Sequence, residues 1–288
     1  MRQFDPTRPP TGRLARLGVL IDPSRPDHQS VARFCDLAGI DVVWIAAPDG
    51  SPAAERWATA EALGGVLRRA RLGVIAGQAD AIGGVAIAEV ALAETDSAGV
   101  AASAIHTLEP TPRLSCAIGS AAEIRPLLTI ADDIVLPAWR FDDLETTADE
   151  IRAEAAESGR NPATLGVAAL LPVSIGRTEA EAAARAEMDP AFVVQGHPRD
   201  IGIFGTLEEC QDRVIALAHA GVTDLRCVLP AVPDVHDVIA QLTAMTIGTT
   251  DVLIPGSLRS PAPPPPEGWG GRPDTPPRQR VSGGSRRR

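Results

Sequence analysis

The chain has 288 residues, of which 44% are hydrophobic, and its formal net charge at pH 7 is −10. This length and hydrophobic content suffice for the core of one large α/β domain. All 27 residues counted as lysine or arginine are arginine. The absence of lysine excludes Schiff-base aldolases, pyridoxal-phosphate enzymes and P-loop proteins, because each needs a primary amine. The acidic balance argues against nucleic acid as a partner.

Targeting and metal-binding signals are also missing from the sequence. The N-terminal residues lack the apolar centre of a secretory signal, and no apolar run approaches the length of a membrane span. We therefore expect a cytoplasmic protein without membrane contact. The cysteines lie far apart, and the histidines show no metal-binding spacing, so we expect reduced core cysteines and no metal centre. The cysteines are Cys35, Cys116, Cys210 and Cys227.

Short apolar segments bounded by turn residues alternate with helical patterns in chain order. The predicted strands cover residues 17–21, 40–46, 70–76, 99–105, 113–118, 133–137, 165–175 and 225–229. The predicted helices cover residues 30–38, 52–69, 83–95, 120–131, 147–158, a segment from 178, a segment from 206, and 235–247. The fourth strand is weak and no helix of normal length follows it. The fourth repeat is therefore expected to be degenerate.

Helix starts and stops carry their own signals. Thr147 with Glu150, and Thr206 with Glu209, have the spacing of a capping box, in which each partner satisfies a free backbone N–H group. Gly221 follows the second of these helices as its natural stop. These signals predict helices that begin near residues 147 and 206.

Continuously apolar strands separated by helices call for a parallel sheet that is covered on its outside. Eight such strands favour a closed (β/α)₈ TIM-like barrel over a doubly wound sheet, which stays an alternative because of the degenerate fourth repeat. We expect a flexible N-terminal arm over residues 1–15, the barrel over 16–255, and a disordered tail over 256–288. The tail is rich in proline, glycine and arginine and has little to bury.

In such a barrel, functional residues gather at the carboxyl ends of the strands. Gly119 and Ser120 stand where a strand turns into a helix, so backbone N–H groups and a hydroxyl could hold a phosphate there. An ordinary turn with serine as the helix cap is the alternative. Arg140 and Arg177 also follow strand ends, where they could pair with an anion or serve as surface residues.

Residues 157–185 (ESGRNPATLGVAALLPVSIGRTEAEAAAR) and 205–225 (GTLEECQDRVIALAHAGVTDL) resemble the late half of the bacterial luciferase-like superfamily. The strands AGIDVVWIA, RRARLGVIAG, RLSCAIGS and ADDIVLPAW resemble its earlier strands. The resemblance implies an oxidoreductase or monooxygenase that uses FMN or the deazaflavin coenzyme F420 on a small organic substrate. It also implies a flavin reductase as electron source and a homodimer.

The same resemblance indicates where the cofactor would bind. A non-proline cis peptide at the end of the third strand supports the ring in such proteins, and the matching positions are Ile75, Ala76 and Gly77. The loop after the fifth strand contributes to phosphate binding, which corresponds to Gly119, Ser120 and Ala121. These six residues form the predicted cofactor site.

Two departures from the family pattern favour a different function. Many members carry an acid–histidine pair just after the second strand, but this chain has Ala47 and Pro48 there. The fourth-repeat region that shapes the substrate cavity is reduced to a short stretch between Asp96 and Pro112. No catalytic residue is therefore assigned, and the alternative is a degenerate, non-catalytic barrel that binds a ligand or a partner.

Overall fold

A computed structural model describes residues 13–45, 53–76, 89–92 and 111–246, all within a compact unit that spans Met1–Ile254. The predicted tail, residues 1–12 of the predicted arm, and Ala47, Pro48 and Gly77 lie outside the described residues. Nothing in the structure therefore tests the predictions made for them.

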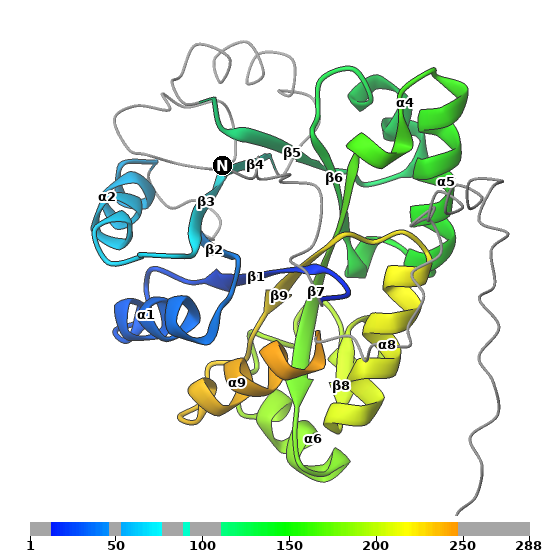
Figure 1. The fold of residues 1–288 in the computed structure, drawn as a ribbon. Coiled ribbons are helices and arrows are strands. Elements are labelled where there is room, and N and C mark those ends of the chain that lie inside the picture. The colour runs from blue at the N-terminus through cyan, green and yellow to red at the C-terminus, as the bar shows by residue number, and fades with distance from the viewer. Residues whose placement is uncertain (1–12, 46–52, 77–88, 93–110, 247–288) are drawn as a thin grey trace, which may run out of the picture. The chain divides into compact units, whose positions relative to one another are not determined.

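Eight parallel strands close into a barrel (Figure 1). The strands pair in chain order, β6 pairs with β7, and β9 lies between β7 and β1. This ring confirms the predicted (β/α)₈ barrel and excludes the doubly wound sheet. The strands are β1 (Arg16–Ile21), β2 (Val42–Ile45), β3 (Arg71–Ala76), β4 (Glu89–Leu92), β5 (Arg113–Ala117), β6 (Asp133–Pro137), β7 (Gly166–Ile175) and β9 (Asp224–Val228).

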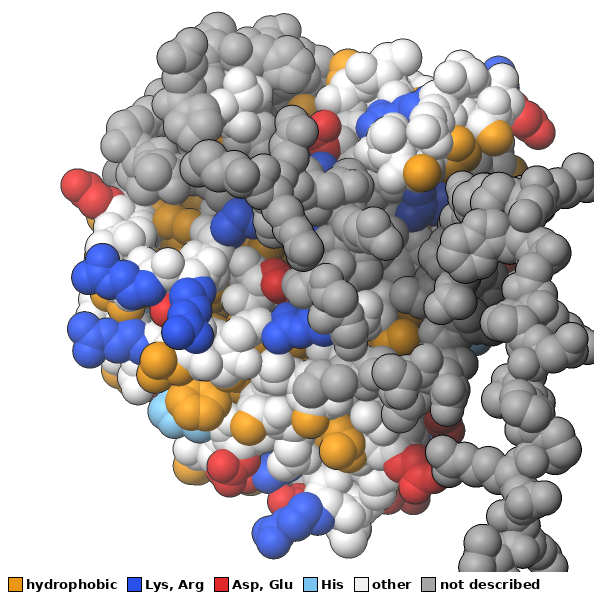
Figure 2. Space-filling view, in the orientation of Figure 1, with side chains coloured by type: hydrophobic (Ala, Val, Ile, Leu, Met, Phe, Trp, Pro, Cys, Tyr) orange, Lys and Arg blue, Asp and Glu red, His pale blue; other side chains and the backbone are white. Residues whose placement is uncertain are grey.

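Helices surround the barrel, as Figure 1 shows. They are α1 (His28–Ala38), α2 (Ala53–Gly64), α4 (Ile124–Leu127), α5 (Leu144–Glu157), α6 (Glu179–Glu187), α7 (Pro198–Ile201), α8 (Leu207–His219) and α9 (Val235–Met245). Three 3₁₀ turns cover Ala121–Glu123, Ala138–Arg140 and Pro162–Thr164. On the face seen in Figure 2, apolar side chains lie in small groups among arginine and acidic side chains. That pattern is ordinary for an outer surface.

The fourth strand is not where the sequence predicts it. Residues 89–92 form β4, although the alanine-rich pattern over 83–95 predicts a helix there. The prediction is wrong because pairing on both sides outweighs helix propensity: Glu89 is in register with Gly73 of β3 and Arg113 of β5. The predicted strand over 99–105 lies outside the described residues.

One predicted capping box is confirmed and the other is wrong. Thr206 accepts a hydrogen bond from the backbone N–H of Glu209, whose carboxylate accepts one from the N–H of Thr206. Helix α5 begins instead at Leu144, because Asp143 caps it by accepting from the N–H of Thr146. The hydroxyl of Thr147 donates to the carbonyl of Asp143 inside the first turn.

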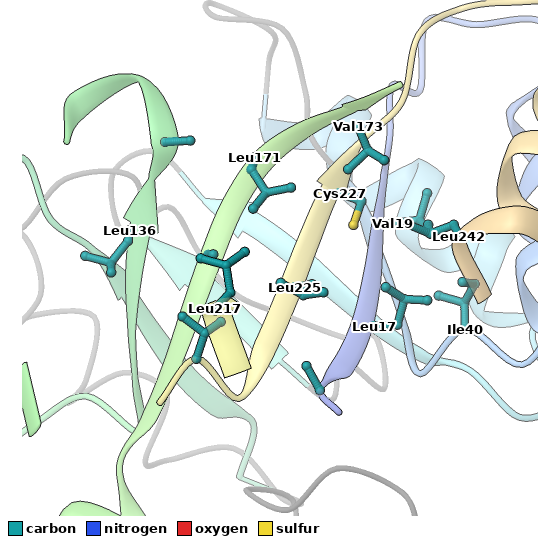
Figure 3. Packing of buried hydrophobic residues seen from close by; sticks show 14 of the residues in the cluster. Leu17, Val19, Ile40, Leu136, Leu171, Val173, Leu217, Leu225, Cys227 and Leu242 are labelled. Atoms are coloured by element: carbon teal, nitrogen blue, oxygen red, sulfur yellow. The ribbon is translucent and has the colours of Figure 1, made fainter. Parts of the chain in front are cut away.

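Alternate strand residues face outward and form the core beneath the helices. Figure 3 shows outward side chains of the central strands packed toward α8 and α9, and all of its labelled residues are buried. These residues are Leu17, Val19, Ile40, Leu136, Leu171, Val173, Leu217, Leu225, Cys227 and Leu242. The residues of this layer are the ones that make the strand segments and helix faces apolar in the sequence.

The four cysteines belong to this buried layer and form no disulfide, as predicted. Burial raises the pKa of Cys35, Cys116 and Cys210 to about 12. A thiol with such a pKa is protonated at neutral pH and is a poor nucleophile. The cysteines therefore serve as packing residues.

Inside the barrel, the amino ends of the strands carry charged side chains that the apolar strand pattern does not predict. Arg16 of β1 donates from NH2 to Glu89 Oε1 of β4 over 2.5 Å. Arg226 of β9 donates from NH2 to Ser115 Oγ of β5 over 2.7 Å. Both hydrogen bonds join strands that are not neighbours in the sheet. We call this group the lumen charge cluster; its charged members are Arg16, Arg71, Glu89, Arg113, Asp133, Asp224 and Arg226.

Trp44 lies next to this cluster and fills the middle of the barrel. Its side chain is fully buried, and the guanidinium of Arg226 lies 4.0 Å from the ring centroid. Glycines on both neighbouring strands make room for the ring: a Cβ on Gly18 would lie 2.7 Å from Trp44 Nε1, and a Cβ on Gly73 would lie 2.7 Å from Trp44 Cδ2. Both distances are too short for a real side chain, so these positions require glycine.

Two buried aspartates in the cluster are held differently. Arg113 donates to both oxygens of Asp133 at 2.5 Å. Burial tends to raise the pKa of Asp133, but these hydrogen bonds and the arginine charge outweigh it and hold the pKa below its ordinary value. Asp224 has only ion pairs at 3.8 Å to Arg16 and 3.7 Å to Arg226, and neither oxygen accepts a hydrogen bond from the described residues. Burial therefore raises its pKa.

Gly73→Ala should destabilise the barrel, because the new methyl group would displace Trp44. Overpacking of a filled interior typically costs about 1–3 kcal/mol. The free energy of unfolding, measured by urea denaturation, should fall by that amount. Gly64→Ala is the matched control, since its Cβ would lie 3.9 Å from the nearest atom, Leu72 Cδ2. Equal stability of Gly73→Ala and Gly64→Ala would contradict the packing of Trp44.

Asp133→Asn should lower the free energy of unfolding by about 3–5 kcal/mol at pH 7, because the Arg113 charge stays buried without its partner. The folded pKa of Asp133 is lowered, so its stabilisation is complete above the ordinary value of 3.8 and is lost as the pH falls through the folded pKa. The difference in the free energy of unfolding between wild type and Asp133→Asn should therefore become smaller below about pH 4.

The control for this variant is Glu154→Gln, which breaks the ion pair with Arg125, a side chain that is 71% exposed. Exposed pairs contribute less than about 1 kcal/mol, so this variant should stay close to wild type. If the difference in unfolding free energy between wild type and Asp133→Asn is the same at pH 7 and pH 3, the Asp133 carboxylate is not bound by Arg113 as described.

Candidate functional site

The carboxyl end of the barrel has an apolar interior, in contrast to the charged amino end. By strand alternation, one inward aliphatic side chain comes from each of five strands, and four of the five are partly exposed. We call these residues the mouth floor: Leu20, Ile75, Ala117, Leu170 and Val228. An apolar surface at the open end of a (β/α)₈ barrel can take the flat ring of a ligand.

The turn after β5 forms a polar rim beside this floor. The backbone N–H of Gly119 donates to both carboxylate oxygens of Glu123 at 3.2 Å, and Ser120 Oγ donates to Glu123 Oε1 at 3.1 Å. Ser120 therefore does not cap the following 3₁₀ turn with its side chain. The alternative of an ordinary turn capped by serine requires that it does. The donors of this turn already hold a negatively charged group.

An arginine adds positive charge to the same turn. A Cβ on Gly119 would lie 3.1 Å from NH1 of Arg140, so the guanidinium rests against the glycine backbone. Arg177 is 87% exposed and pairs instead with Glu181, at 3.3 Å from Nε to Oε2. Of the two arginines singled out in the sequence, only Arg140 is therefore placed next to the predicted phosphate site.

The two parts of the predicted cofactor site lie on the same rim. Ile75 is in the mouth floor, and Ala76 ends β3. Strand β4 separates β3 from β5, which places Ile75 about 10 Å from the β5 rim, or two strand spacings. Gly119 and Ser120 follow β5, and Ala121 is exposed beside them. Gly77 lies outside the described residues.

A long connection between β7 and α8 covers the other side of the barrel mouth. Residues 176–206 contain α6, α7 and the short strand β8 (Ile203–Gly205), which pairs with the carboxyl end of β7. We call this connection the β7–α8 excursion. Arg185 donates to Asp234 Oδ2 at 3.0 Å from Nε and 2.5 Å from NH2, and Ala231 N–H donates to Asp189 Oδ2 at 2.8 Å. These bonds fix the excursion against the loop after β9.

No protein-family model and no curated protein matches the chain. Solved structures match its fold. An F420-dependent secondary alcohol dehydrogenase, solved with an F420–acetone adduct, is 14% identical with a TM-score of 0.61, over 80% of this chain and 98% of that one. A riboflavin lyase, solved with modified FMN and riboflavin, is 14% identical with a TM-score of 0.57, over 80% of this chain and 91% of that one.

A long-chain alkane monooxygenase is 11% identical with a TM-score of 0.56, over 82% of this chain and 93% of that one. The chain shares the (β/α)₈ barrel fold of these three proteins. At these identities the similarity establishes the architecture, whereas the chemistry has to be argued from the chain's own residues.

Local sequence did not predict the role of one residue on the rim of the barrel. Glu123 binds the turn that is predicted to hold phosphate, and the S-x-x-E spacing from Ser120 to Glu123 is the signal that could have revealed it. The excursion was also missed, because β8 has only three residues and its partner is in β7. The position of the excursion depends on its contacts with β7 and with the loop after β9, which local sequence does not reveal.

The described residues of this barrel contain no group of three or more metal-ligating side chains, and none of their helices has the length and apolar character of a membrane span. Ala47 and Pro48, the positions that replace the acid–histidine pair, lie outside the part that the structure describes. No catalytic residue is therefore assigned from the geometry.

Proposed function

We propose that this protein is an oxidoreductase that uses reduced FMN or coenzyme F420 to transform a small organic molecule. The observation that supports it best is the pairing of a half-exposed apolar mouth floor with a rim that binds a carboxylate. FMN and coenzyme F420 each join a flat ring to a phosphate group, so they present the two chemistries that these surfaces complement. When bound, the cofactor supplies hydride or oxygen chemistry, and the protein supplies binding and orientation.

In this proposal one group of residues contacts the ring of the cofactor and another binds its phosphate. The end of β3, with Ile75, Ala76 and Gly77, supports one face of the ring and keeps water from it. The N–H of Gly119, the hydroxyl of Ser120 and the adjacent residue Ala121 receive the phosphate. Arg140 adds its positive charge to this turn.

The alternative function is a non-catalytic barrel that binds a ligand or partner. The sequence feature that favours it is the pair Ala47 and Pro48, which can supply neither an acid nor a base after the second strand. Binding of cofactor without turnover of any small organic substrate would support the alternative. A flavin reductase as electron source and a homodimer remain predictions from the resemblance, and a cytoplasmic location remains a prediction from the lack of targeting signals in the sequence.

The cofactor proposal is tested by titrating the protein with FMN, riboflavin and F420 and following flavin fluorescence and absorbance. FMN should bind more tightly than riboflavin, which lacks the phosphate. Ser120→Asp places a second negative charge at the turn, so it should weaken FMN binding about tenfold and change riboflavin binding little.

The matched control is Ser158→Asp, at an exposed serine that ends α5. It should leave FMN binding unchanged. If the wild-type protein binds neither FMN nor F420 well above micromolar concentration, the cofactor proposal fails. If it binds FMN and Ser120→Asp binds it equally well, only the phosphate position is wrong.

Glu123→Gln should strengthen FMN binding about fivefold, because a phosphate no longer has to displace a carboxylate from the N–H of Gly119. Riboflavin binding should not change, since riboflavin has no group for this turn. Isothermal titration of wild type and variant with both ligands measures the two effects. Weaker FMN binding by Glu123→Gln would mean that Glu123 positions the turn for the ligand and does not compete with it.

A further inference from the structure

A pocket of about 300 Å³ lies where the carboxyl ends of β1 and β9 meet the β7–α8 excursion. It stands on the β1–β9 side of the mouth, whereas the predicted cofactor residues stand on the β3–β5 side. Most of its wall is aliphatic or aromatic, including Leu20, Ile21, Val31, Phe192, Val228 and Val235. Its size is at the small end of the range for ligand sites.

The carboxylate of Asp189 lines the pocket but is already fully engaged. Its Oδ1 accepts from the backbone N–H groups of Ala191 at 3.1 Å and Phe192 at 3.3 Å, and its Oδ2 accepts from Ala231 at 2.8 Å. Asp189 therefore shapes the wall by holding two chain segments together. It is not free to select a ligand.

Arg25, the one arginine among the described residues of the wall, is neutralised. Arg25 donates from Nε and NH2 to the two oxygens of Asp27, at 3.0 and 2.9 Å, and this pairing lowers the pKa of Asp27. Asp22, the other carboxylate of the wall, accepts from the N–H of Ser24 at 2.8 Å. With Asp22 and Asp189 present and Arg25 paired, the charge around the pocket is negative. An anion would be repelled there.

The pocket shares two lining residues with the mouth floor. Leu20 and Val228 belong to both, because each ends the inward row of its strand and also lines the pocket. A molecule bound in the pocket would therefore lie beside a ring that rests on the floor. This is the arrangement that a substrate needs if it is to react with a bound cofactor.

We propose that this pocket binds the apolar body of an uncharged substrate of about ten non-hydrogen atoms, such as a small alcohol, ketone or arene. The assignment of the ligand as substrate rests on the proposed oxidoreductase function, whereas the binding itself does not require a cofactor. The walls supply the affinity through apolar burial, and the carboxylates exclude organic anions.

Three ligands of nearly equal size test the proposal by isothermal titration without cofactor: 2-naphthylmethanol, 2-naphthoate and 2-naphthylmethylammonium. The neutral alcohol should bind best. The carboxylates repel 2-naphthoate, which should bind at least about tenfold more weakly. The ammonium ligand would lose its hydration in an apolar wall where Asp189 is already engaged by three backbone N–H groups, so it should also bind more weakly than the alcohol. Ala231→Trp and Ala191→Trp, two independent substitutions in the pocket wall, should each weaken binding of the alcohol at least about tenfold by filling the space.

Ala240→Trp is the control, because Ala240 is exposed on α9 and is not part of the wall. It should bind the alcohol as wild type does. The proposal is overturned if both wall variants keep wild-type affinity for the alcohol, if 2-naphthoate binds as tightly as the alcohol, or if the ammonium ligand binds tightest. FMN titration of the same proteins separates failure of the pocket from failure of the cofactor proposal.

Discussion

Hydrogen bonds across the inside of the barrel are the constraint on which the rest of the structure depends. Arg226 reaches from β9 to Ser115 on β5, and Arg16 reaches from β1 to Glu89 on β4. These pairs connect strands that are not neighbours in the sheet and share no backbone hydrogen bonds. They therefore fix the shape of the barrel's cross-section. A shift of one residue in any of these strands would move its charge into the apolar layer beneath the helices.

This arrangement makes the two ends of the barrel chemically different. Charged side chains fill the amino end, and Trp44 fills the middle of the barrel, where Gly18 and Gly73 have no side chains and leave room for the ring. Buried ion pairs add little net stability compared with apolar packing, but they are intolerant of the loss of one partner. The cluster therefore serves to specify one register, and the open, aliphatic carboxyl end is left for ligands.

The sequence predicted the layer under the helices well, because outward apolar residues and glycine stops are local signals. It did not predict the lumen charge cluster, although a charged residue stands at or near the start of several strands. The partners Ser115 and Arg226 are 111 positions apart, and no local pattern joins them. For the same reason β4 is predicted as part of a helix, whereas the turn at Gly119 and Ser120 can be predicted from the local strand–turn pattern.

The position of the pocket bears on the absent acid–histidine pair. The mouth floor is aliphatic, so it can hold and desolvate a ring but cannot exchange a proton with a substrate. On the pocket side, Asp189 is occupied by three backbone N–H groups, whereas Asp22 accepts one from Ser24 through Oδ1. Asp22 therefore keeps more of its carboxylate open to a bound molecule than Asp189 does. The polar group that a substrate in this pocket could meet then lies on the β1 side of the mouth, whereas the residues of the proposed cofactor site lie at the ends of β3 and β5.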